Sequence, residues 1–168
     1  MNIKPEQLQN SLSNQLASTY FAFGAEILLV EQSLSMIKGI ARENGFNERF
    51  RFDIDGNFSW DIIISLISSP SLFAEKRIIE CRFTTGKIGV KGSKALTEIL
   101  QTLPDDILLI ISSGKLEMAQ QKSKWFKTLD KKGIIIQHWE VQSTNWLDGL
   151  QETCPNSVLT RILKLLMQ

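Results

Sequence analysis

The run Ile107-Leu108-Leu109-Ile110-Ile111 limits the possible folds more than any other stretch of this 168-residue sequence. Each of its positions is apolar, so both faces of the backbone need to be covered. A strand of this kind is typical of the centre of a parallel sheet that has helices packed on both faces. The sequence therefore predicts an α/β domain whose core is deepest at 107–111.

Segments typical of strands and of helices alternate on both sides of this run. In chain order, we expect a helix over 5–15, a strand over 19–23, a helix over 27–44, a strand over 50–54, a helix over 59–69, a strand over 76–83, a loop over 84–92, a helix over 96–103, the central strand, a lysine-rich helix over 116–132 and a strand over 134–136. This alternation predicts a mainly parallel, doubly wound sheet with right-handed crossovers.

In two of these segments, the residue pattern indicates which side faces the core. Phe50, Phe52 and Ile54 alternate with charged residues, which indicates a strand with one solvated face near a sheet edge. In the helix over 27–44, apolar residues recur at steps of three and four, as expected for a buried face. This face consists of Ile27, Val30, Leu34, Ile37 and Ala41.

The composition excludes several classes of protein. The 19 basic and 18 acidic side chains nearly cancel, which argues against nucleic acid as the main partner. Cys81 and Cys154 are far apart and form no C-x-x-C motif, so neither a disulfide framework nor a zinc site is predicted. No apolar run approaches the length of a membrane span, and the N-terminus does not resemble a signal peptide. We expect a soluble cytoplasmic protein.

The first strand-to-helix turn, at Gly24, is where a fold of this kind would bind a nucleotide. The phosphate-loop pattern G-x-x-x-x-G-K-[ST] fails there, because no second glycine, lysine or hydroxyl follows at the required spacing. The glycine-rich basic stretch 86–94 has the wrong spacing for a phosphate fingerprint, and we interpret it as a solvated connection. The enzyme alternative is an α/β nucleotide-binding enzyme that acts near Gly24, Ser112, Ser113 and Gly114.

Other candidate groups have simpler structural interpretations. His138 is the only histidine, so a His-based metal cluster is excluded and a structural role is favoured. Asp105 and Asp106 precede the central strand, at the end opposite to ligand sites, and are interpreted as turn residues. The lysine-rich helix allows weak contact with nucleic acid as a third hypothesis. Its Trp125 and Leu129, at i and i+4, are better explained as core residues.

Leu72 and Phe73 are the apolar pair without such an explanation. They lie in a polar segment interrupted by Pro70, where a loop normally carries small or polar residues. The pattern alone allows two interpretations equally: the pair covers the core of its own domain, or it docks into a partner.

Several motifs together resemble the N-terminal domain of the delta subunit of the bacterial DNA polymerase III clamp loader. They occur in family order and at nearly family spacing over about residues 1–137. The matching motifs are Pro5-Glu6-Gln7-Leu8, Tyr20-Phe21-Ala22-Phe23-Gly24-Ala25-Glu26-Ile27-Leu28-Leu29, Ser71-Leu72-Phe73-Ala74-Glu75-Lys76-Arg77, Asp105-Asp106-Ile107-Leu108-Leu109-Ile110, Lys115-Leu116 and Trp125-Phe126.

The resemblance implies an AAA+-like, P-loop-NTPase-like domain that has lost its phosphate loop and needs no cofactor. Members of this family bind the ring-shaped sliding clamp and favour opening of one ring interface, while other clamp-loader subunits hydrolyse ATP. The family's apolar clamp contact matches Leu72 and Phe73, with Pro70 and Ser71 before them. Clamp-binding sequences often resemble Q-L-S-[LF]-F, and here Ser69-Pro70 replace the first two residues.

The end of the chain has a different character. Two short helical segments are expected around 146–150 and 157–167, on either side of Pro155. Family members are usually about twice as long and carry a helical lid and a helical collar. The resemblance therefore implies a clamp-binding domain over 1–141 and the start of the lid over 142–168.

Overall fold

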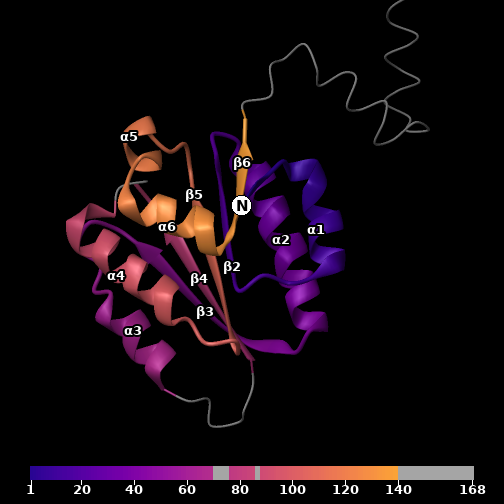
Figure 1. Ribbon diagram of the computed structural model, residues 1–168, viewed down its shortest axis with the longest axis horizontal. Helices are drawn as coiled ribbons and strands as arrows, with labels where there is room; N and C mark the ends of the chain where they lie inside the picture. The colour runs from indigo at the N-terminus through magenta and orange to yellow at the C-terminus, as the bar shows by residue number, and fades with distance from the viewer. Residues whose placement is uncertain (70–75, 86–87, 140–168) are drawn as a thin grey trace, which may run out of the picture.

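The computed structural model describes residues 1–69, 76–85 and 88–139, which form one α/β unit (Figure 1). The strands are β1 (Asn2–Ile3), β2 (Thr19–Gly24), β3 (Phe46–Ile54), β4 (Lys76–Phe83), β5 (Ile107–Ser113) and β6 (Ile134–His138). The helices are the short 3-10 helix η1 (Pro5–Gln7), α1 (Leu8–Asn14), α2 (Ile27–Glu43), α3 (Asp61–Ser68), α4 (Gly89–Thr102), α5 (Met118–Gln121) and α6 (Lys124–Lys132).

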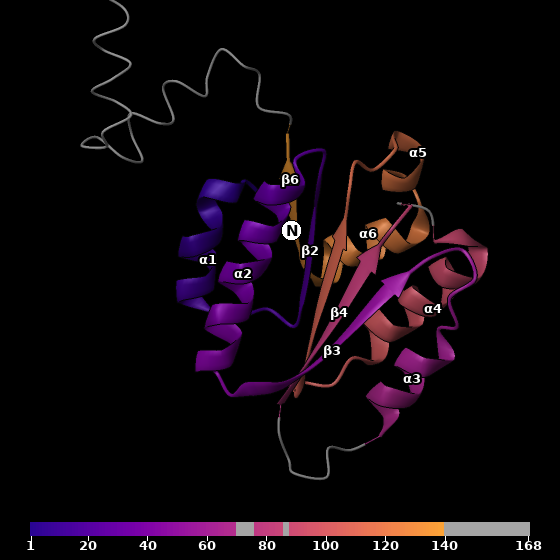
Figure 2. The same ribbon diagram turned by 180° about the vertical axis from the view of Figure 1, so that it is seen from behind.

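The strands form one sheet in the order β1-β6-β2-β5-β4-β3, and the neighbouring strands pair in parallel. Helices α1 and α2 lie on one face, and α3, α4 and α6 lie on the other, as the opposite views in Figures 1 and 2 show. Strand β5 lies between β2 and β4 and is buried along its whole length. The predicted doubly wound fold with a central strand at 107–111 is confirmed.

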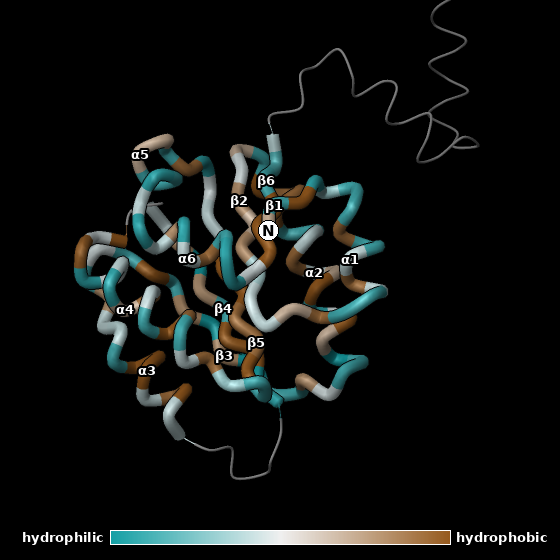
Figure 3. Tube along the Cα trace, viewed as in Figure 1, coloured by the Kyte–Doolittle hydropathy of each residue, from teal (hydrophilic) through white to brown (hydrophobic). Residues whose placement is uncertain are grey.

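The central strand contributes to a separate core on each face of the sheet. Ile107, Leu109 and Ile111 pack on the side of α3, α4 and α6, whereas Leu108 and Ile110 pack on the side of α1 and α2. Figure 3 shows hydrophobic residues along β5 and a mixture of hydrophobic and hydrophilic residues on α2. This division explains why every position of β5 is apolar.

The structure differs from the expected elements at several places. β3 begins at Phe46, four residues before the predicted start. β1 was not predicted, because two residues carry no recognisable strand period. α4 already begins at Gly89 rather than after the glycine-rich loop. The lysine-rich helix is divided into α5 and α6, because Ser123 has extended backbone angles. Ile27 is 57% exposed rather than buried, since α2 begins there, at the edge of the sheet.

β3 is an edge strand, as predicted. Its alternating charged residues lie on the same face of the sheet as α1 and α2, where they are accessible to solvent. Arg49, Arg51 and Asp53 are exposed there. Beside them, Glu80 of β4 is only 1% exposed and binds two cations. Arg49 Nη2 and Lys38 Nζ lie 2.6 Å and 3.6 Å from Glu80 Oε2. This ion cluster, in which Glu80 is buried and Arg49 is exposed, joins α2, β3 and β4.

The structure contains no candidate for a membrane-crossing helix among the residues it describes, since none of those helices is sufficiently long and apolar.

Candidate functional site

The predicted site residues Pro70, Ser71, Leu72 and Phe73 lie outside the described residues, but the elements that flank them are described. Helix α3 ends at Ser68, and β4 begins at Lys76. Both ends lie at the edge of the sheet where the parallel strands begin (Figure 1). The described flanks of the segment therefore lie at the edge opposite to the usual ligand side of such sheets.

Side-chain hydroxyls bond back to the last turn of α3. The hydroxyls of Ser68 and Ser69 donate to the carbonyl oxygens of Ile64 and Ser65, each at 2.8 Å. The backbone N–H of Ser69 also donates to the Ser65 carbonyl oxygen, at 3.0 Å. The helix ends at Ser68, two residues before Pro70, because the residue before a proline disfavours helical backbone angles.

Arg77 connects this helix end with the start of two strands. Its side chain is buried, and its Nη1 donates a hydrogen bond of 2.9 Å to the carbonyl oxygen of Leu66 in α3. Its backbone nitrogen donates to the carbonyl oxygen of Asp106 at 2.8 Å. Its Nη2 also lies 3.7 Å from Asp106 Oδ2. Asp106 thus lies in the turn that was predicted for it and holds Arg77 as well.

Lys76 provides a second attachment at the start of β4. Its Nζ donates to the carbonyl oxygen of Asn44 at 3.2 Å, and it lies 5.2 Å from the centre of the Phe46 ring. Sequence reasoning assigned no role to Lys76 or Arg77. Their position directly after the predicted site, within the same family motif, could have marked them as candidates. Their contacts could not be predicted, because their partners are distant in sequence.

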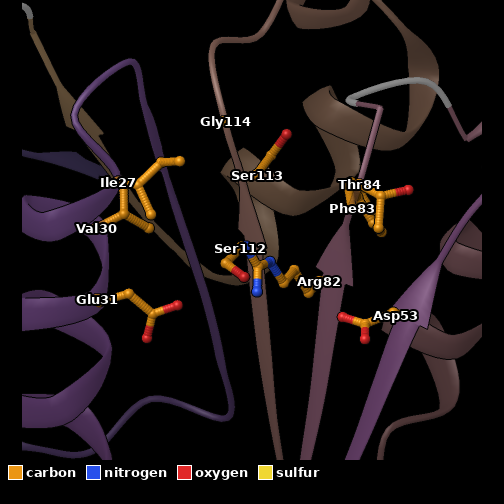
Figure 4. Close-up of a pocket in the computed structure, with 10 residues that line it drawn as sticks. All are labelled: Ile27, Val30, Glu31, Asp53, Arg82, Phe83, Thr84, Ser112, Ser113 and Gly114. Atoms are coloured by element: carbon orange, nitrogen blue, oxygen red, sulfur yellow. The ribbon is translucent and has the colours of Figure 1, made fainter.

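The enzyme alternative would use the opposite edge, where a cavity of about 310 Å³ lies between α2 and strands β3 to β5. Ser112, Ser113 and Gly114 line this cavity, as that alternative requires. Figure 4 shows the Arg82 guanidinium beside Ser112, with the Glu31 carboxylate on one side and the Asp53 carboxylate on the other. Because two carboxylates face one guanidinium, the cavity is poorly suited to the negative charge of a phosphate chain.

Gly24 has a packing role at the end of β2. A Cβ atom added to Gly24 would lie 2.4 Å from the carbonyl oxygen of His138, because β6 runs directly beside it. The glycine therefore permits close approach of two strands. This contact explains Gly24 without a phosphate-binding role.

His138 is buried and pairs with Ser33 of α2. Its Nε2 lies 3.0 Å from Ser33 Oγ. Burial lowers the pKa of His138, and the nearby Glu6 partly opposes this effect. Both side chains are buried, so substrate has no access to the serine. The pair joins α2 to β6 and fits the structural role predicted for the histidine. The described residues contain no cluster of three or more potential metal-binding side chains.

The aromatic residues of the lysine-rich region belong to the core. Trp125 and Leu129 are buried, as predicted. The Trp125 ring makes edge contacts with the rings of Phe21 and Phe83, at centroid distances of 5.8 Å and 5.9 Å. Trp125 is therefore not free to stack on bases, and this observation disfavours the nucleic-acid hypothesis.

Comparison with known proteins relates the chain to one family. A family model described as "DNA polymerase III, delta subunit" matches residues 20–138. DNA polymerase III subunit delta of Escherichia coli K12 is 31% identical over 136 residues, which cover 81% of this chain and 40% of that protein. The Haemophilus influenzae protein of the same name is 31% identical over 129 residues, which cover 77% of this chain and 37% of that protein. The chain thus spans less than half the length of these relatives.

Solved structures show the same fold at low sequence identity. The Bacillus subtilis DNA clamp loader delta protein matches 89% of this chain and 47% of its own chain, with a TM-score of 0.65 and 19% identity. The Aeropyrum pernix ORC2 protein matches 89% of this chain and 49% of its own, with a TM-score of 0.52 and 12% identity. These similarities support the AAA+-like fold that the sequence motifs imply.

Proposed function

Because the chain belongs to the DNA polymerase III delta-subunit family, we propose that it is the part of a clamp loader that binds the sliding clamp during DNA replication. In this proposal Leu72 and Phe73 insert into a pocket on the clamp, and Pro70 and Ser71 shape the approach. The bound subunit then favours opening of one interface of the ring. The observation that carries the proposal is the family match, which continues on both sides of 70–75.

The chemistry of the pair suits such a contact. Burial of one leucine and one phenylalanine side chain contributes roughly 1.5–3 kcal/mol each, which is enough for a compact hot spot. Pro70 restricts the backbone before the pair and reduces the entropy that docking costs. The described flanks support this assignment, since Arg77 of β4 donates a hydrogen bond to the Leu66 carbonyl of α3 and so joins the two elements.

The family match also bears on which subunit hydrolyses ATP. We propose that this chain binds the clamp without hydrolysing ATP and that other clamp-loader subunits supply the ATPase. The carboxylates of Glu31 and Asp53 beside Arg82 support this view, because they oppose a phosphate chain in the cavity. We assign the clamp-binding domain to 1–141 and the start of a helical lid, which leads toward the other subunits, to 142–168.

Surface plasmon resonance on the immobilised sliding clamp of the source organism tests the proposal. The double variant Leu72→Ala, Phe73→Ala should lose at least about a hundredfold in affinity, from the transfer free energies above. Ile27 and Leu28 provide a matched control, since they form another adjacent apolar pair and are 57% and 82% exposed. The variant Ile27→Ala, Leu28→Ala should bind like the wild type.

Two results would contradict the proposal. One is a folded Leu72→Ala, Phe73→Ala variant that keeps wild-type affinity. The other is an equal loss in the Ile27→Ala, Leu28→Ala variant, which would indicate nonspecific hydrophobic contact. Calorimetry with magnesium and ATP examines the nucleotide-binding alternative, and saturable micromolar binding would favour that enzyme over our proposal.

A further inference from the structure

Arg77 is unusual because it is a strand arginine that is only 4% exposed. Buried arginine is rare unless its charge and its N–H groups are satisfied. Here Nη1 bonds to the Leu66 carbonyl, and Nη2 lies near the Asp106 carboxylate. Nε has no hydrogen-bond partner among the described residues. A buried cation with an unsatisfied N–H group is costly, so core packing alone does not account for it.

The contact with Leu66 is a cap on the carboxyl end of α3. Leu66 is among the last residues of the helix, where carbonyl groups lack partners within the helix and carry partial negative charge. A guanidinium is favoured at this end by its charge and its hydrogen bond. The Arg77 side chain therefore fixes the last turn of α3, although Arg77 itself belongs to β4.

This cap spans the segment that we propose for clamp binding. Leu66 precedes residues 70–75 and Arg77 follows them, so one side chain joins the two flanks of the segment. Asp106 holds the backbone and the guanidinium of Arg77 from the turn before β5. The central strand and the end of α3 are thus connected through Arg77, and both ends of the segment have fixed positions.

We propose that Arg77 is a positioning residue for the clamp contact: by capping α3 across the base of 70–75, it holds the ends of the segment that carries Leu72 and Phe73. This inference rests on the proposed function. Fixing both ends reduces the conformations that the segment loses on docking, which raises affinity without any contact between Arg77 and the clamp.

Variants of Arg77 test the inference in the full chain with the immobilised clamp. Arg77→Met keeps most of the side-chain volume and removes the hydrogen bond and the charge. It should weaken clamp binding about fivefold to tenfold, which corresponds to the net contribution of one ordinary hydrogen bond. Arg77→Lys retains a cation at the end of α3 and should restore part of that affinity.

Glu80→Gln is the control for simple destabilisation. Glu80 lies on the same strand, is also buried and also binds cations, but its partners Arg49 and Lys38 lie away from the end of α3. It should lower the melting temperature without weakening clamp binding at a temperature where the protein is folded. Equal losses of affinity in Glu80→Gln and Arg77→Met would overturn the inference.

A double-mutant cycle separates positioning from an independent effect. If Arg77 acts through the apolar pair, Arg77→Met should weaken binding less in a Leu72→Ala background than in the wild type. Equal fold losses in both backgrounds, or wild-type affinity of a folded Arg77→Met variant, would disprove the positioning role. Failure of the proposed function is recognised separately, because the Leu72→Ala, Phe73→Ala variant would then bind like the wild type.

Discussion

Arg49 Nη2 lies 2.6 Å from Glu80 Oε2 and joins the edge strand β3 to its neighbour β4. Lys38 of α2 also reaches this carboxylate, at 3.6 Å. Glu80 is buried and Arg49 is partly exposed, so the two partners contribute unequally to stability.

The first prediction follows from this inequality. Glu80→Gln should lower the free energy of unfolding by about 2–3 kcal/mol, because it leaves Lys38 with little solvent and without a counter-charge. Arg49→Ala should cost about 1 kcal/mol, since Lys38 still neutralises Glu80. Urea unfolding followed by circular dichroism measures both values. Equal effects of the two substitutions would contradict this account.

The second prediction compares two glycines. Gly24→Ala should destabilise the protein by more than about 2 kcal/mol, because the new Cβ would lie 2.4 Å from the backbone oxygen of His138. Gly39→Ala is the matched control, since a Cβ atom added to Gly39 in α2 would meet nothing within 4 Å. It should stabilise the protein by about 0.5–1 kcal/mol through helix propensity. Thermal unfolding of the two variants should shift the midpoint in opposite directions.

The third prediction concerns acid stability. Burial lowers the pKa of His138, so the unfolded chain binds a proton more readily than the folded chain. The free energy of unfolding should therefore fall as the pH drops below 6.5, the ordinary histidine pKa that applies in the unfolded chain. It should continue to fall until the pH reaches the lower pKa of His138 in the folded chain. The maximal slope for one proton is about 1.4 kcal/mol per pH unit.

His138→Gln isolates this effect, because His138 is the only histidine in the chain. Urea unfolding at about pH 7.5 and at about pH 5, on either side of the ordinary histidine pKa of 6.5, should show a smaller loss of stability in the variant than in the wild type. Parallel curves for the two proteins would show that His138 does not couple folding to protonation.

The fourth prediction concerns Cys81. Its thiol is buried, and burial, together with the neighbouring charge of Glu80, raises its pKa to about 12. The thiolate is the reactive form, so Cys81 should react very slowly in the folded protein. In a Cys154→Ser variant, labelling by a thiol reagent should begin only where urea unfolds the chain. Rapid labelling without urea would contradict the burial of Cys81.

Sequence reasoning succeeded where the pattern is local. The limits of β4 were predicted at Lys76 and Phe83, and the end of α2 was predicted near Gly45, which has a φ of 88°. The start of α4 was predicted too late, because its first turn contains Gly89 and Gly92. Gly92 is needed there because Trp60, distant in sequence, lies against it: an added Cβ would be 2.8 Å from Trp60 Nε1.

In the candidate site, too, local patterns could be predicted and contacts between distant residues could not. Leu72 and Phe73 could be selected as an apolar pair out of place, and their clamp contact stays a prediction. The contacts of Arg77 with Leu66 and Asp106 could not be inferred from spacing, since they join α3, β4 and the turn before β5. Likewise, the partnership of Glu80 with Lys38 depends on where α2 crosses the sheet.

The position of β2 in the sheet has a consequence for the order of events during synthesis on the ribosome. β2 pairs with β5 and β6, and Thr19 has Leu109 as its partner. β2 therefore has no neighbouring strand until most of the domain has been translated, whereas β3 and β4 can pair much earlier. Non-local parallel pairing is slow to form and exposes apolar strands meanwhile. During synthesis, Tyr20-Phe21-Ala22-Phe23 therefore has no partner strand until the central strand has been translated.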